Sequence, residues 1–259
     1  MTVLELSHPL PPGALLGPEV QALHNALSHE GAAWLRARSE YVEQQEDDNT
    51  SWVTDWRSAT TGHVARPTQP NRQNGRFDAQ ARVPAMYFRS QMHCGYAVEN
   101  IANTAERFSL AVIYKSADKE GRSLASVSVG DNTNILFAAE YSGQIVIKDR
   151  AGTFELECPA PDTRTHYALV VISYEVGKLR CAVNGGEVLE ASGNAPGMEQ
   201  AAKLFIGCRN NRAGLMKTLG DARITDVLYW PDRTILPPKA SNVATPELMM
   251  LRNYFRWNT

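Results

Sequence analysis

The chain has 259 residues, of which 43% are hydrophobic and 21% are charged, and its formal net charge at pH 7 is -2. A chain of this length suits one large β domain or two small domains. The near-neutral charge argues against a nucleic-acid partner, which a basic surface would indicate. Because the sequence contains no run of about 18 apolar residues, we expect no insertion into a membrane.

The N-terminal residues combine a proline-rich stretch with one short helical pattern. Residues 1–13 contain three prolines, which predict irregular structure. Residues 17–28 predict a helix, because Val20, Leu23 and Leu27 recur at helical spacing. The sequence therefore predicts a short helix ahead of the first strand.

We expect the chain to divide into two parts. Residues 1–29 are interpreted as an N-terminal extension that docks on a neighbouring subunit, and residues 30–259 as a β domain. The first residues show neither the basic segment nor the long apolar segment of a secretory signal. We therefore expect synthesis in a cytoplasm.

The middle of the chain changes to a β-rich pattern. Residues 32–38 predict a strand with Trp34 as a large apolar anchor. Residues 43–50 read as an acidic surface loop, and residues 59–82, which hold few apolar anchors, read as a long surface loop.

From residue 84 onward, short apolar runs alternate with turns rich in Gly, Asn and Asp. Asn184-Gly185 is a strong hairpin signal, because both residues tolerate positive φ. Many short strands with little helix predict an all-β fold, a two-sheet antiparallel sandwich. A helix is expected at residues 245–257, with Thr245 as its cap. The expected strands are 84–90, 107–117, 123–130, 134–141, 143–149, 153–159, 166–177, 179–185, 187–192, 203–209 and 222–231.

The four cysteines are Cys94, Cys158, Cys181 and Cys208. Their wide spacing matches neither a zinc motif nor a redox CxxC pair. Since free cysteine often behaves as a small apolar residue, we expect buried, reduced thiols. A cytoplasmic origin gives no reason to expect disulfides.

Several segments follow, in order, the pattern of one known family. Residues 32–41 read AAWLRARSEY, as in the family's opening strand, and residues 51–77 take the place of the loop segment after it. Residues 166–188 read HYALVVISYEVGKLRCAVNGGEV, as in its long strand and hairpin ending in Asn-Gly, and residues 222–235 are similar to its last strand. Over roughly residues 30–258 the chain thus resembles the laminin-G-like, concanavalin-A-like jelly-roll domains. The resemblance implies a jelly-roll sandwich with a short N-terminal helical extension and a C-terminal helix.

Some enzymes of that fold hydrolyse β-glucans with carboxylates alternating along one strand, as in E-x-D-x-x-E. Glu155 and Glu157 stand two residues apart, and Glu187 and Glu190 would point to opposite faces of a strand. Neither pair matches the motif, and we interpret both as charges on solvent-facing positions. We therefore expect that the chain is not an enzyme.

A calcium ion is the one candidate cofactor. Several relatives by fold bind it at a sandwich edge, and the GDNTN turn offers hard oxygen ligands in Asp131, Asn132 and Asn134. The same residues are ordinary turn formers. Both interpretations stay open.

A glycan site would combine exposed aromatic rings with amide and charged side chains. Trp52, Trp56, Asn210, Asn211 and Arg212 lie in loop-like segments and are the candidates. The alternative is that the two tryptophans pack inside the domain, as tryptophan commonly does.

Two functions from different classes fit these observations. The first is a structural or attachment protein of an assembled particle, a bacteriophage virion, as a capsid decoration, fibre or tail component. Such a protein is made in the cytoplasm without an export signal, and its partners are other virion proteins or further copies of itself. The second is a soluble carbohydrate-binding module that recognises a surface glycan. A glycoside hydrolase is a third alternative, which would require a carboxylate pair in a cleft.

Overall fold

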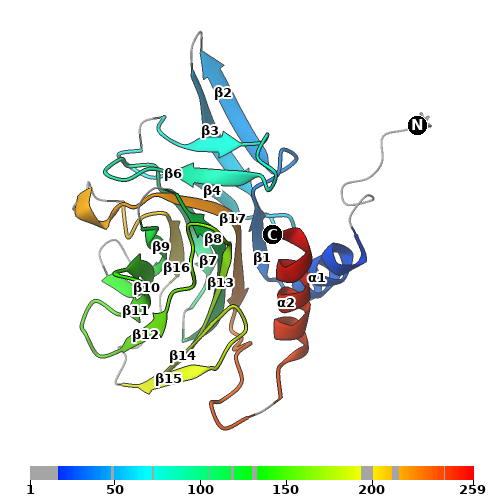
Figure 1. The fold of residues 1–259 in the computed structure, drawn as a ribbon, viewed down its shortest axis with the longest axis vertical. Coiled ribbons are helices and arrows are strands. Elements are labelled where there is room, and N and C mark those ends of the chain that lie inside the picture. Colours follow the sequence, from blue (N-terminus) through cyan, green and yellow to red (C-terminus); the bar gives the residue numbers. More distant parts are fainter. Residues whose placement is uncertain are drawn as a thin grey trace.

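The computed structural model describes residues 17–47, 50–71, 73–104, 106–117, 120–129, 133–193, 201–211, 216–241 and 243–259. These residues form two antiparallel β-sheets packed face to face, with two helices against one of them (Figure 1). The prediction of an all-β, two-sheet sandwich with a helix near each end is confirmed.

One sheet has eight strands in the order β15-β14-β13-β8-β17-β6-β5, and β1 pairs with β17 beside β6. We call it the eight-stranded sheet. Its strands are β1 (Ala33–Arg36), β5 (Arg76–Asp78), β6 (Ala85–Phe88), β8 (Arg107–Ser116), β13 (Ala168–Glu175), β14 (Lys178–Val183), β15 (Leu189–Ser192) and β17 (Ala222–Pro231).

The other sheet has nine strands in the order β12-β11-β10-β9-β16-β7-β4-β3-β2, and we call it the nine-stranded sheet. Its strands are β2 (Val42–Asp47), β3 (Thr50–Arg57), β4 (Val64–Pro67), β7 (Tyr96–Ala102), β9 (Arg122–Val129), β10 (Thr133–Tyr141), β11 (Gln144–Lys148), β12 (Glu155–Pro159) and β16 (Ala202–Ile206).

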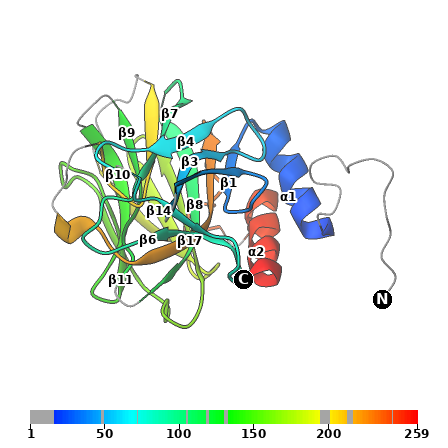
Figure 2. The same ribbon diagram turned by 90° about the horizontal axis from the view of Figure 1, so that it is seen from above.

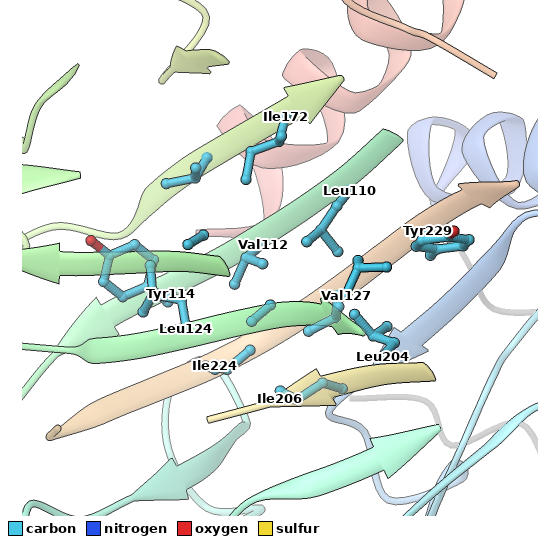
Figure 3. Close-up of a cluster of buried hydrophobic side chains, with 14 of the residues drawn as sticks. Leu110, Val112, Tyr114, Leu124, Val127, Ile172, Leu204, Ile206, Ile224 and Tyr229 are labelled. Carbon is cyan, nitrogen blue, oxygen red and sulfur yellow. The ribbon is translucent and has the colours of Figure 1, made fainter. Parts of the chain in front are cut away.

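The main core lies between the two sheets (Figure 3). On β8, Leu110 and Val112 point inward, and they face Val127 and Leu204 of the nine-stranded sheet. Alternation along each strand places every second residue in this core. Each such aliphatic side chain stabilises the fold by about 1.5–3 kcal/mol when fully buried.

A second apolar cluster lies on the outer face of the eight-stranded sheet. The helices α1 (Pro18–His29) and α2 (Pro246–Asn258) cover this face, as Figure 2 shows from above. Leu27 of α1 and Leu251 of α2 are buried there against Trp34 of β1. The Thr245 hydroxyl accepts a hydrogen bond from the Leu248 amide, which confirms the predicted cap of the C-terminal helix.

The helix α1 packs on this chain. It occupies most of the described part of the predicted docking segment, residues 1–29. The apolar face of this helix is buried against α2 and β1 of the same chain. Residues 1–16 lie outside the described residues. Within the described ranges, neither helix has the length and apolar character needed to cross a bilayer.

A buried polar centre joins α2 to the covered face. The Asp226 carboxylate accepts hydrogen bonds from Trp34 Nε1 and from the Tyr254 hydroxyl, each at 2.9 Å. The Arg36 guanidinium lies 4.0 Å from the same carboxylate and 4.6 Å from the centre of the Trp34 ring. All four residues are buried, so this centre fixes the position of α2 on the sheet.

Two predicted loops contain strands. Residues 43–47 belong to β2, Thr50 begins the antiparallel partner β3, and the range 59–82 includes β4 and β5. Strand β2 lies at the edge of its sheet and exposes all residues after Val42, so its sequence has no apolar alternation. The predicted turn at Asn184-Gly185 is confirmed, with φ of 51° and 72°.

The four cysteines are buried and free of disulfides. Cys158 on β12 and Cys181 on β14 come from opposite sheets and hydrogen-bond to each other, and that bond together with burial raises the pKa of Cys181 well above the ordinary range. These thiols are therefore part of the core packing.

Candidate functional site

The outer face of the nine-stranded sheet carries a groove of about 410 Å³. The groove lies over β9 to β12, on the side of the sheet opposite the core. The helices α1 and α2 pack on the other sheet, so neither covers this face (Figure 2). Its main lining residues are Arg122, Phe137, Ala139, Tyr141, Val146, Lys148, Glu155, Glu157 and Arg209. The short 3-10 helix η1 (Met216–Thr218) contributes Lys217 and Thr218 to the lining of the groove.

The floor of the groove is apolar because of strand alternation. On β10, Leu136 and Ala138 point into the core, which turns Phe137 and Ala139 to the outer face. Val146 of β11 pairs with Ala139 and continues the floor. These floor side chains are at most 8% exposed, since the walls of the groove cover them.

Two guanidinium groups form one wall. Arg209 lies 3.9 Å from the centre of the Phe137 ring, and its Nε donates to the Ser123 hydroxyl at 3.2 Å. Arg122 lies 4.6 Å from the centre of the Tyr141 ring, which is 52% exposed. Both arginines therefore rest on aromatic rings, an arrangement worth about 0.5–2 kcal/mol each.

The two arginines repel each other. Burial, and then the charge of Arg122, lower the pKa of Arg209. Arg122 also adopts φ of 53°, a left-handed conformation that costs an ordinary side chain about 1–2 kcal/mol. It is held there beside a register shift between β9 and β10 and by an ion pair with Glu120 at 3.1 Å. An anion in the groove would relieve this repulsion.

Carboxylates form the opposite wall. Glu155 and Glu157 alternate along β12 with Leu156 and Cys158, which point into the core. Both glutamates are exposed, as predicted, and both line the groove. Lys148 forms an ion pair with Glu155 at 3.2 Å. The groove thus offers hydrogen-bond acceptors opposite a cationic wall.

A buried carboxylate supports the groove from behind. Glu140 points to the inner side of β10 and accepts hydrogen bonds from the Gly121 amide at 2.8 Å and the Thr163 hydroxyl at 2.6 Å. The Ser116 hydroxyl donates a further short bond. These bonds fix the ends of β9 and β10 next to Arg122 and Tyr141. Glu140 therefore positions the groove residues.

The predicted tryptophans lie elsewhere. Trp56 is fully buried, donates from Nε1 to the Arg36 carbonyl at 2.8 Å, and packs edge-on to Tyr96 with ring centres 6.2 Å apart. Trp52 is 7% exposed on β3. Neither ring presents a free face for sugar stacking, so the packing alternative describes both.

Two of the three predicted loop residues are next to a groove residue in the sequence. Asn210 and Asn211 directly follow Arg209, and Arg212 lies outside the described residues. Sequence reasoning missed Arg122, Tyr141 and Arg209. The alternation of Phe137 and Tyr141 on β10 was the available signal, but it identifies an outer face without showing which residues of other strands lie on it.

The calcium prediction stays a prediction. Asp131 and Asn132 lie outside the described residues, and so does the side chain of Asn134, whose backbone belongs to β10. Among the side chains that the structure describes, no group of three or more His, Cys, Asp or Glu is arranged to hold a metal ion.

No family model matches the chain, and no curated protein matches it. Solved structures share its fold. The sialidase of Trypanosoma rangeli in complex with sialic acid aligns with a TM-score of 0.55 at 13% identity, over 88% of this chain and 33% of that chain. The binding domain of botulinum neurotoxin DC in complex with SialylT aligns with a TM-score of 0.50 at 10% identity, over 84% of this chain and 51% of that chain.

The sialidases overturn the expectation that the chain is not an enzyme. They are enzymes, and a third of each of their chains has this fold, so a sandwich of this kind is no argument against an enzyme. A structure described as a receptor binding domain aligns as well, with a TM-score of 0.53 at 10% identity, over 90% of this chain and 53% of that chain. This chain therefore spans between a third and about half of the proteins it resembles, and at these identities the likeness shows the fold.

Proposed function

We propose that the chain is a glycan-binding module and that the groove over β9 to β12 is its binding site. The observation that carries the proposal is the combination of an apolar floor, an exposed tyrosine and two ring-stacked arginines on an uncovered sheet face. Saccharides offer apolar ring faces and many hydroxyl groups, and sites for small polar ligands combine aromatic surface with a few placed polar groups.

The charges favour an acidic saccharide. Arg122 and Arg209 stand close enough for their charges to interact, and a carboxylate accepts paired hydrogen bonds from guanidinium groups. Glu155 and Glu157 on the opposite wall would accept hydrogen bonds from sugar hydroxyls. The neighbours support this choice, since a sialidase was solved with sialic acid and a toxin binding domain with SialylT.

Two finer statements belong to the same proposal. The order of segments along the chain supports a laminin-G type of jelly roll. The finer form of the proposed function is an attachment protein of a virion, in which the groove would recognise a host glycan. The partners would then be other virion proteins or further copies of the chain.

The proposal is tested by screening the full chain on an array of sialylated, sulfated and neutral glycans. Wild type is expected to bind the sialylated set, and Tyr141→Ala is expected to lose most of the signal because it removes the exposed ring. Arg66→Ala is the matched control. Arg66 lies on the same sheet, pairs with Ala97 and forms an ion pair with Asp55 at 3.1 Å, away from the groove.

Analysis of the glycans after incubation separates binding from turnover. If wild type releases sugar and Glu157→Gln does not, the chain is a hydrolase that uses the β12 carboxylates and not a binding module. Equal array signals for wild type and Tyr141→Ala, or a blank array from folded protein, would contradict the proposal.

A further inference from the structure

A second cleft lies on the outer face of the eight-stranded sheet, beyond the end of the helical cover. Its volume is about 840 Å³, and Thr259, which follows α2, closes one side. Four other segments converge on it: the loop before β6, the end of β8, the loop before β13 and the start of β17. Its charged and aromatic lining residues are Arg82, Lys115, Arg164, His166, Tyr167 and Arg223.

A row of cationic and aromatic side chains crosses the sheet here. Lys115 of β8 pairs with Arg223 of β17, and Arg223 pairs in turn with Tyr87 of β6. Paired residues of antiparallel strands point to the same face. Because Tyr114 and Ile224 point into the core, Lys115 and Arg223 share the outer face.

The row extends in both directions. On one side, Tyr87 pairs with Arg76 of β5. On the other, Ala168 of β13 pairs with Tyr114, so Tyr167 lies next to Lys115, and both line the cleft. The row therefore has the two cations Lys115 and Arg223 side by side at its centre, with Tyr167 on one side and Tyr87 and Arg76 on the other.

Stability does not explain why Lys115 stands opposite Arg223, although the Arg223 guanidinium lies 5.5 Å from the centre of the Tyr87 ring. Like charges placed directly opposite each other on neighbouring strands destabilise a sheet. Asp78, at 3.5 Å from Arg223, partly offsets the charge. Arg82 and Arg164 are exposed around the cleft and add to the positive field.

The geometry points to a binding site for a ligand that carries two or more phosphate or sulfate groups. Lys115 and Arg223 would bind one group at the sheet surface, and Arg82 and Arg164 would bind another at the rim. Arginine and lysine donate charge-assisted hydrogen bonds to such oxyanions. This site is on the opposite sheet from the groove over β9 to β12 and does not depend on the proposed function of that groove.

Calorimetric titration of the full chain with inorganic pyrophosphate, sucrose octasulfate and inorganic phosphate tests the site. Wild type is expected to bind the first two more tightly than phosphate. Lys115→Gln combined with Arg223→Gln is expected to weaken both by at least about ten-fold, as loss of charge-assisted hydrogen bonds implies. Lys178→Gln, at the far end of the same sheet, is the control and should bind like wild type.

The melting temperature without ligand is the second readout. Lys115→Gln removes one of two opposed like charges, so its melting temperature should equal or exceed that of wild type. A structural role for Lys115 would lower it. Unchanged affinity in the double variant, or no binding of any of the three probes at low salt, would overturn the assignment.

Discussion

Strand alternation places side chains on both outer faces of the sandwich, but the two faces differ in composition and in what covers them. On the eight-stranded sheet, the outward positions are apolar under α1 and α2, and they make a second core around Asp226. On the nine-stranded sheet, the outward positions over β9 to β12 mix Phe137 and Val146 with arginines and glutamates, and neither α1 nor α2 covers them. Outward apolar residues thus form a second core where helices cover them, and they form the floor of a groove where α1 and α2 do not.

The largest expected effect tests the covered face. Asp226→Ala leaves Arg36 buried without its counter-charge and removes the acceptor of Trp34 and Tyr254. Breaking one partner of a buried pair costs about 3–5 kcal/mol. Urea unfolding followed by tryptophan fluorescence measures the loss. A cost below about 1 kcal/mol would show that α2 is held mainly by apolar contacts.

A matched pair of tyrosine variants compares the faces directly. Tyr254→Phe removes a hydroxyl that donates to the buried Asp226 carboxylate, and bonds to charged groups contribute about 1.5–3 kcal/mol. Tyr141→Phe removes a hydroxyl from a side chain that is 52% exposed, so the free energy of unfolding of this variant should differ from that of wild type by less than about 0.5 kcal/mol. Equal costs for the two variants would contradict the distinction between a covered and an open face.

A smaller, pH-dependent effect is expected at the turn between β11 and β12, which carries one wall of the groove. Burial acts to raise the pKa of Asp149, but hydrogen bonds from Thr153 and from the Phe154 amide outweigh it and hold the pKa below its ordinary value. Asp149→Ala should cost about 1 kcal/mol at neutral pH, as loss of similar side-chain caps does.

The sign of the pH effect follows from that lowered pKa. The stabilising contribution of Asp149 is complete above the unfolded-state pKa of about 3.9 and is lost as pH falls through the lower folded-state pKa. The difference in free energy of unfolding between wild type and Asp149→Ala should therefore stay constant from pH 7 to about pH 5 and shrink towards pH 3. A difference that grows on acidification would contradict this account.

Strand order along the chain could be predicted from sequence, whereas the groove could not. Alternation and turn residues located the central strands, and Thr245 marked the start of α2. The groove joins Arg122 to Tyr141 and Arg209 through the register of β9 with β10 and the loop after β16. The register between strands that are distant in the sequence depends on how they pack, and a local sequence pattern does not predict it. For the same reason Trp56 resembled a loop residue, although β3 and Tyr96 bury it.

The most direct test of the central claim is calorimetric titration of the full chain with 3′-sialyllactose and with lactose. The account predicts that sialyllactose binds to wild type, that lactose binds at least about ten-fold more weakly, and that Arg209→Gln removes most of this preference. Equal affinity for the two sugars, or a preference that persists in Arg209→Gln, would contradict an acidic-glycan site in the groove.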